Sequence, residues 1–121
     1  MATLTAQTQL TVSGINSDDM ALDVTMTPTV LAGGIISKTI TAKSSGSAVE
    51  ILYAAHYAAG TIVYLRNTST SETAHIELTS GTEHLTIGAS QWAVFPWKAA
   101  TDMKAHCSDD LVLEVGVFSA T

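Results

Sequence analysis

The sequence predicts an all-β protein: a two-sheet antiparallel β-sandwich, jelly-roll-like, with an extended N-terminal arm or strand. Apolar and polar residues alternate through many short segments, which is the pattern of half-buried strands. Turn residues recur about every 8–12 positions, the spacing typical of sandwiches and barrels. No segment shows the amphipathic period of a helix, so strands must supply both layers of the core.

The N-terminal segment alternates cleanly and is followed by a run of turn residues. Leu4, Leu10 and Val12 fall on its apolar face. We divide the chain into an arm or strand, 1–14, and a single β-sandwich domain, 15–121. Twelve extended residues span at most about 40 Å, so the arm can reach a neighbouring subunit. There Leu4 and Leu10 would fill pockets, whereas Val12 would lie near the root of the arm. Alternatively, the segment pairs inside its own sandwich as the first strand.

The rest of the chain alternates in the same way. The segment 61–66 is apolar on both faces, which indicates a central strand. The alanine-rich segment 54–60 predicts a single helical turn or an irregular crossover. The predicted strands are 20–26, 35–43, 49–53, 61–66, 74–79, 82–87, 91–97, 103–107 and 111–118.

For one hairpin, the sequence alone predicts which residues of its two strands lie opposite each other. A two-residue turn at Ser80-Gly81 places apolar residues opposite apolar residues and polar opposite polar, which a slip of one residue would spoil. The predicted pairs are Ala74 with Ile87, His75 with Thr86, Ile76 with Leu85, and Glu77 with His84.

The aromatic strand 91–97 holds both tryptophans. Trp92 points to one face of this strand, and Phe95 and Trp97 point to the other. We therefore expect both tryptophans to be largely buried, one in the core and one at a core edge or subunit contact. The alternative is that they form a platform for stacking sugars. Pro96 cannot donate to a β-ladder, which places it at a strand end or on an edge strand.

Composition limits the function. Charged residues are only 13% of the chain, against about 25% in ordinary soluble domains, so part of the surface is expected to be hidden in an oligomer. The net charge of −6, with only five Lys and Arg residues, argues against nucleic-acid binding. The N-terminus has no signal-peptide pattern, and no apolar run is long enough to cross a membrane.

The histidines are the main candidates for chemistry. His75, Glu77 and His84 would share one face of the registered hairpin and could bind a divalent metal. The simpler interpretation is a solvated polar face with a weak Glu77–His84 pair, and we expect no metal and no cofactor. His106 and Cys107 are adjacent, so they point to opposite faces of a strand and do not form a catalytic couple.

The remaining reactive or acidic residues have structural explanations. Cys107 is the single cysteine, so the chain forms no intrachain disulfide, and we expect it to be a small core residue. The pairs Asp18-Asp19 and Asp109-Asp110 lie among turn residues, where aspartate is favoured by its hydrogen bonds to the backbone. No catalytic or phosphate-binding motif is present, so the sequence predicts a protein that is not an enzyme.

Three motifs in the second half resemble small virion structural proteins of tailed bacteriophages. The first, Gly60-Thr61-Ile62-Val63-Tyr64-Leu65-Arg66-Asn67-Thr68, is similar to the Gly-x-x-Val-Tyr-Leu-Lys-Asn-Thr strand of that family. Val94-Phe95-Pro96-Trp97 and Leu113-Glu114-Val115-Gly116-Val117-Phe118 follow in the family's order. The chain departs from the family at Ala89-Ser90-Gln91, where Gly-Glu is usual, and at Val115, where Tyr is usual.

The resemblance implies a virion component, assembled in the host cytoplasm, and carries no catalytic residue. Our first hypothesis is a capsid decoration (cement) protein that stabilises the phage head. Its expected partners are other copies of itself, as a homotrimer, and the major capsid protein, with no nucleic acid and no membrane. The alternative is a head- or tail-fibre adhesion module that binds host surface glycans. A cupin-like enzyme is disfavoured because the chain lacks a His-x-His pair.

Overall fold

The computed structural model describes residues 2–12, 20–27, 29–30, 32–41, 43–79 and 81–119, and almost all of their regular structure is β-strand. This confirms the all-β class. The two short 3-10 turns among these residues are η1 (Ser45–Ser47) and η2 (Ala54–His56), and η2 is the turn expected within 54–60. The strands are β1 (Ala2–Thr3), β2 (Ala6–Val12), β3 (Met20–Met26), β4 (Thr29–Val30), β5 (Ala32–Ile40), β6 (Val49–Leu52), β7 (Thr61–Asn67), β8 (Ala74–Thr79), β9 (Thr82–Ile87), β10 (Trp92–Trp97), β11 (Met103–His106) and β12 (Leu111–Ser119).

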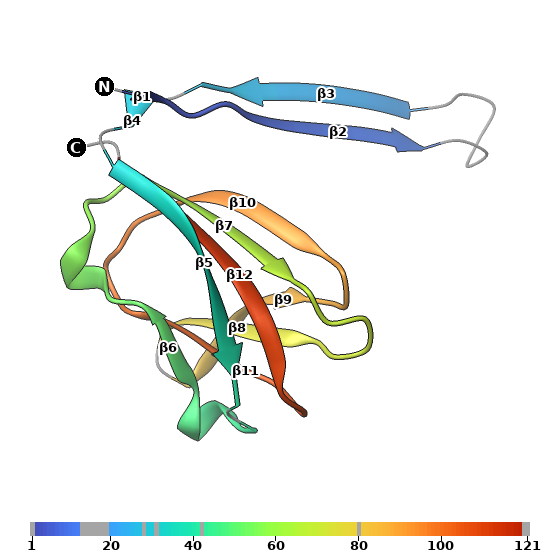
Figure 1. Ribbon diagram of the computed structural model, residues 1–121, viewed down its shortest axis with the longest axis vertical. Helices are drawn as coiled ribbons and strands as arrows, with labels where there is room; N and C mark the ends of the chain where they lie inside the picture. The colour runs from blue at the N-terminus through green and yellow to red at the C-terminus, as the bar shows by residue number, and fades with distance from the viewer. Residues whose placement is uncertain are drawn as a thin grey trace.

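Eight strands form the body of the molecule as two four-stranded sheets (Figure 1). The first sheet has the order β10-β7-β12-β5 and the second the order β6-β11-β8-β9. β7 lies between two neighbours, as its two apolar faces predict, and β10 is an edge strand, which accommodates Pro96.

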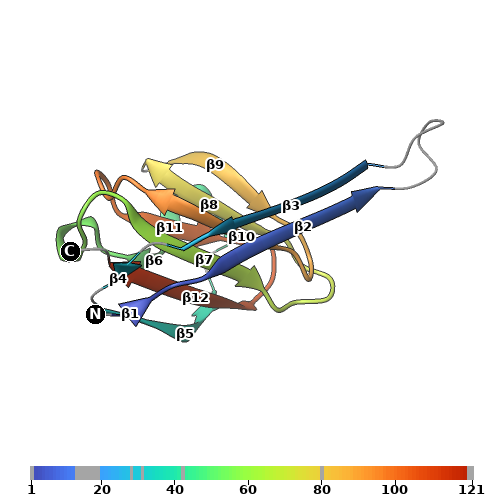
Figure 2. The same cartoon turned by 90° about the horizontal axis from the view of Figure 1, so that it is seen from above.

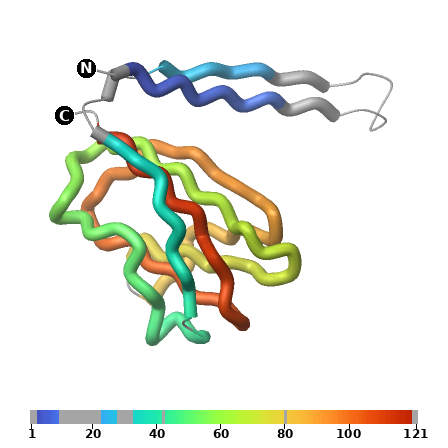
Figure 3. The backbone as a smooth tube through the Cα atoms, in the orientation of Figure 1, coloured from blue at the N-terminus to red at the C-terminus, as the bar shows by residue number. Residues whose placement is uncertain are grey.

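The pairing of these eight strands is nested. β8 pairs with β9, β7 with β10, β6 with β11 and β5 with β12, all antiparallel. The chain therefore behaves as one long hairpin that is folded over into two layers, and β5 and β12, from its two ends, lie side by side (Figure 3). This nesting is the jelly-roll topology, so the predicted sandwich and its topology are both confirmed.

The core lies between the two sheets. Trp97 belongs to this core, and its ring lies 6.0 Å from that of Tyr57, measured between centroids. Cys107 is buried in this core, as expected, and burial raises the pKa of its thiol. The other buried apolar residues of the cluster are Ile40, Ile51, Leu52, Val63, Leu65, Ala74, Ile76, Ile87, Met103, Ala105, Leu111, Leu113 and Val115.

The register of the β8–β9 hairpin is confirmed for three of its four expected pairs: Ala74–Ile87, His75–Thr86 and Ile76–Leu85. The fourth expectation is wrong, because the register shifts after Ile76 and places Glu77 opposite Glu83 instead of His84. The shift is a bulge that leaves His84 on β9 without an opposite residue on β8. Glu77 keeps its regular position opposite Lys104 on β11 but is only 1% exposed, so it is not solvated as expected.

The N-terminal segment forms a hairpin instead of a single strand. β2 pairs along its whole length with β3 in a separate two-stranded sheet, so the sandwich itself begins at β5. The short β1–β4 pair, with Ala2 opposite Val30, anchors the base of the hairpin, so Val12 lies at the distal end of β2 and not near the root. Figure 2 shows the distal ends of β2 and β3 extending past the sandwich.

Candidate functional site

The outer face of the first sheet carries three rows of side chains that cross its four strands. Alternate residues of each strand point to this face because side chains of a strand alternate in direction. The pairing places aromatic, aliphatic and charged residues in adjacent rows. Each row is given in the strand order β10, β7, β12, β5. The first row is Trp92, Arg66, Glu114 and Ser37, and the second is Val94, Tyr64, Gly116 and Ile35. The third row is Pro96, Ile62, Phe118 and Gly33.

Two glycines leave room for the large side chains of these rows. A Cβ atom at Gly116 would lie 3.2 Å from the Cβ of Tyr64 and 3.3 Å from Cγ1 of Ile35. A Cβ at Gly33 would collide with the ring of Phe118. Glycine at these positions allows the Tyr64 and Phe118 rings to lie close to the sheet.

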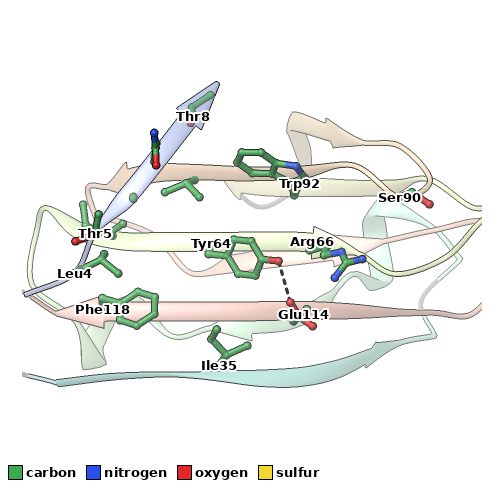
Figure 4. Close-up of a pocket in the computed structure, with 14 residues that line it drawn as sticks. Leu4, Thr5, Thr8, Ile35, Tyr64, Arg66, Ser90, Trp92, Glu114 and Phe118 are labelled. Atoms are coloured by element: carbon green, nitrogen blue, oxygen red, sulfur yellow. Dashed lines mark hydrogen bonds between the residues drawn. The ribbon is translucent and has the colours of Figure 1, made fainter. Parts of the chain in front are cut away.

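The root of the hairpin turns this face into a groove of about 690 Å³ (Figure 4). Residues 4–8 form one wall, and the side chains of Leu4, Ala6 and Thr8 are half-buried while those between them are exposed. This alternation is the one predicted for the arm. The floor comes from all four strands of the first sheet, and Ser90 lines the groove from the turn before β10. The sheet residues that line the groove are Ile35, Ile62, Tyr64, Arg66, Trp92, Val94, Glu114 and Phe118.

Polar groups lie at one end of the groove. The Tyr64 hydroxyl donates a hydrogen bond of 2.9 Å to Oε1 of Glu114, shown as a dashed line in Figure 4. Burial, followed by this hydrogen bond, raises the pKa of Tyr64. Arg66 and the half-exposed ring of Trp92 lie beside this pair (Figure 4). The groove thus combines an apolar floor with an aromatic ring, a guanidinium and a carboxylate, which suits a ligand with both apolar and hydrogen-bonding groups.

The structure separates the residues singled out in the sequence. Trp97 is in the core and 4% exposed, and Phe95 packs against that core. Trp92 is 50% exposed on the opposite face, so the expectation that both tryptophans are largely buried holds only for Trp97. The two rings consequently do not form one platform. Leu4 lines the groove, whereas the side chains of Leu10 and Val12 lie outside the described residues.

The sequence did not single out Tyr64, Arg66, Glu114 and Ile35 as site residues. The segment 61–66 is apolar on both faces, which predicts a central strand and does not indicate a site on either face. The available signal was one charged residue in each of two largely apolar strands, Arg66 in β7 and Glu114 in β12, because a charged residue marks a face that reaches solvent.

The expected group of His75, Glu77 and His84 does not assemble. His84 is exposed, and its Nδ1 lies 3.0 Å from the carbonyl oxygen of Thr82. Glu77 instead contacts His106 on β11, with 2.9 Å between its Oε2 and Nδ1 of the imidazole. The register shift passes over His84 on β9 and so removes this imidazole from the pair with Glu77, whereas the contact with His106 comes from the regular pairing of β8 with β11.

A different group forms on the outer face of the second sheet. His75 contacts Glu83, with 2.8 Å between Nδ1 and Oε1, and the Thr86 hydroxyl donates to the same oxygen at 2.5 Å. The Thr86 hydrogen bond, and then the one from His75, lower the pKa of Glu83. His106 completes the group from the neighbouring strand.

In the acidic turn 109–110 both aspartates pair with Lys43, and their expected hydrogen bonds to the backbone stay a prediction. Lys43 lies 2.5 Å from Asp110 and 3.8 Å from Asp109, in exposed ion pairs. Such pairs contribute little to stability, because water screens them. The pair Asp18-Asp19 lies outside the described residues.

Comparisons with protein-family models, with curated proteins and with solved structures find no match for this chain. Within the described residues, no helix is long and apolar enough to cross a bilayer. Function is therefore inferred from the residues, the fold and the groove.

Proposed function

We propose that this chain is a non-enzymatic virion structural protein, a capsid decoration (cement) protein that stabilises the head of a tailed bacteriophage. The observation that carries the proposal is the β2–β3 hairpin, which extends past a jelly-roll body and leaves an apolar groove at its root. The three motifs that resemble phage virion proteins support it independently.

The hairpin is built to contact another protein. A two-stranded hairpin is marginally stable alone in water, so it needs a surface to pack against. The body supplies such a surface to residues 4–8, which form one wall of the groove. Within the described residues β2 and β3 have no third strand, so each has an outer edge where main-chain groups can add a strand of a neighbouring protein.

The surface composition agrees with an assembled protein. Ile35 and Ile36 are adjacent on the edge strand β5 and are 58% and 57% exposed. Ile35 lies on the outer face of the first sheet, as does Trp92, whereas Ile36 points to the other side of this edge strand. Each of these exposed apolar side chains is available for contact with a neighbouring copy or with the major capsid protein. We propose a homotrimer on the virion, and light scattering of the purified protein measures its oligomeric state directly.

Deleting the hairpin tests the proposal. Removal of residues 2–27 leaves all eight strands of the sandwich, so the variant is expected to fold with a sharp melting transition. The binding assay uses phage particles that were assembled in the absence of this protein. The variant should bind them at least about tenfold more weakly than the full chain does, because its main contact element is missing. The matched control is Val112→Ser, which changes an exposed apolar residue on the outer face away from the hairpin groove.

The number of copies in purified particles gives a second test. A cement protein covers the head lattice and should be present in hundreds of copies on the head, as seen by imaging and by quantitative mass spectrometry. Full binding by the hairpin deletion, or a total absence of the chain from particles, contradicts the proposal.

One observation favours the alternative function, an adhesion module that binds host glycans. Trp92 presents half of its indole to the groove beside Arg66 and Glu114, and an aromatic ring with nearby charged hydrogen-bonding groups suits a sugar. A fibre module would be present in tens of copies, and Trp92→Ala would abolish its binding to glycans while leaving its attachment to particles intact.

A further inference from the structure

The outer face of the second sheet carries a stacked pair of imidazoles. His75 on β8 lies directly opposite His106 on β11. Their rings are nearly parallel, at 15°, and their centroids are 4.9 Å apart. This spacing follows from the antiparallel pairing, which holds directly opposed residues about 4.5–5.5 Å apart. The backbone therefore places the two rings side by side.

Each imidazole has its own carboxylate. Glu83 Oε1 lies 2.8 Å from Nδ1 of His75, and Glu77 Oε2 lies 2.9 Å from Nδ1 of His106. Glu77 is held in place because its other oxygen accepts the N–H of Gly81 at 2.7 Å. An ionised carboxylate only accepts, so a neutral His106 donates from Nδ1 and presents the lone pair of Nε2.

We propose that His75, His106 and Glu83 bind one divalent transition-metal ion, best matched by zinc, with water as a fourth ligand. Two imidazoles and one carboxylate are a donor set typical of zinc. Glu77 would act as the carboxylate that orients His106, the usual arrangement around metal-bound histidines. This site is on the opposite sheet from the groove and is independent of the virion role.

The geometry requires a small adjustment. The three candidate ligand atoms lie within 4.8 Å of one another. Bonds of 2.0–2.1 Å in a tetrahedron place the donor atoms about 3.4 Å apart, so binding must close the group by about 1.4 Å. The side chain of Glu83 is 39% exposed and can rotate, whereas His106 is 14% exposed and stays in place.

A bound ion would join three strands of the second sheet, β8, β9 and β11, each of which supplies one ligand. The unfolded chain does not hold these ligands together, so the ion binds the folded state preferentially. Zinc should therefore raise the melting temperature in proportion to the logarithm of its concentration.

The experiment uses the full chain without a polyhistidine tag, freed of metal by a chelator that is then removed. Titration with zinc in a calorimeter should show one ion per chain with a dissociation constant of about 10 μM or lower. Cobalt(II) bound in the same place should show the visible absorption of a tetrahedral site. Glu83→Gln and His106→Ala should each weaken zinc binding at least about tenfold.

The matched control is His84→Ala, which removes an exposed imidazole from the same hairpin outside the group. It should leave zinc affinity unchanged. Circular dichroism establishes that each variant folds, and the exposed Glu83→Gln decides the question if His106→Ala does not. Absence of saturable binding below about 100 μM zinc, binding unchanged in Glu83→Gln, or equal loss in His84→Ala would show that the group is only a stacked pair of imidazoles with acidic partners.

Discussion

Asn67, the last residue of β7, connects the two sheets through its side-chain amide and is the most informative single site for the stability of the sandwich. It is fully buried. Its Nδ2 donates to the carbonyl oxygens of Glu72 at 2.7 Å, Ile87 at 3.0 Å and Gly88 at 3.2 Å. Its Oδ1 accepts the N–H of Ser69 at 3.0 Å. These partners precede β8 or end β9, so they belong to the opposite sheet and its connections.

The expected cost of Asn67→Ala follows from these contacts. The amide has two hydrogens, which the three carbonyl groups share, and its oxygen makes one further bond. Loss of three hydrogen bonds at about 1 kcal/mol each, with at least one buried carbonyl left without a donor, destabilises the fold by about 4 kcal/mol. That is a large part of the 5–15 kcal/mol typical of a domain of this size.

Asn67→Asp keeps the size of the side chain but directs an oxygen at the same three carbonyl groups. They favour the neutral acid, so the folded-state pKa of this aspartate is raised above its unfolded value of about 3.9. The stabilising contribution of the bound proton is then present below that value and is lost as the pH rises through the folded-state pKa. The variant should lose stability between about pH 4 and pH 7 relative to the wild-type protein.

Urea unfolding followed by tryptophan fluorescence measures these differences, since Trp97 is buried in the core. The matched control is Thr68→Val, which removes one hydrogen bond of 2.7 Å from an exposed hydroxyl to Val112 and should cost less than about 1 kcal/mol. A loss of less than about 1.5 kcal/mol for Asn67→Ala, with an unchanged dependence on urea, would refute the role of Asn67 as a connection between the sheets.

Three further outcomes follow from the positions of other residues. Trp97→Ala should lower the free energy of unfolding by about 3–5 kcal/mol and Trp92→Ala by less than about 1 kcal/mol, because only the Trp97 ring is in the core. Thermal or urea unfolding measures both values, and equal losses would contradict the assignment of the two rings to opposite faces. The Cys107 thiol is buried and its pKa is raised, so its reaction with a disulfide reagent should be about 1000-fold slower in the native protein than in the unfolded chain. Rapid labelling of the native protein would show instead that the thiol is accessible. The pKa of Tyr64 is raised by burial, so the stability that depends on its protonated form is present up to about pH 10 and is lost at higher pH. The melting temperature of Tyr64→Phe should therefore fall less between about pH 9 and pH 11 than that of the wild-type protein. Identical pH profiles of the two proteins would contradict this.

Several local features could be predicted from the sequence. The strand 92–97 sends Trp92 and Trp97 to opposite faces because successive side chains of a strand alternate. Three pairs of the β8–β9 hairpin were predicted because a short turn and matched apolar residues allow only one register. Cys107 was expected in the core because a single cysteine without a catalytic partner is usually a small buried residue, and it is buried.

The fourth pair of that hairpin could not be predicted. The buried contact of Glu77 with His106 joins two strands that are distant in the sequence. A bulge adds one residue to a strand without a compositional signature here, and it leaves His84 on β9 without an opposite residue. The same event removes His84 from the expected histidine group. The arm illustrates a similar limit, since its strand was predicted while its pairing with β3 and its base at Ala2 and Val30 were not.

The sequence by itself determined which segments are strands and which side chains share a face, because the period of two residues is a local property of the backbone. The tertiary structure decided which strands lie together. The pairing of β5 with β12, the groove beneath Leu4 and the contact of His75 with His106 all join segments distant in the sequence. Such contacts depend on how whole faces pack against one another, and the order of residues along a single strand does not specify that packing.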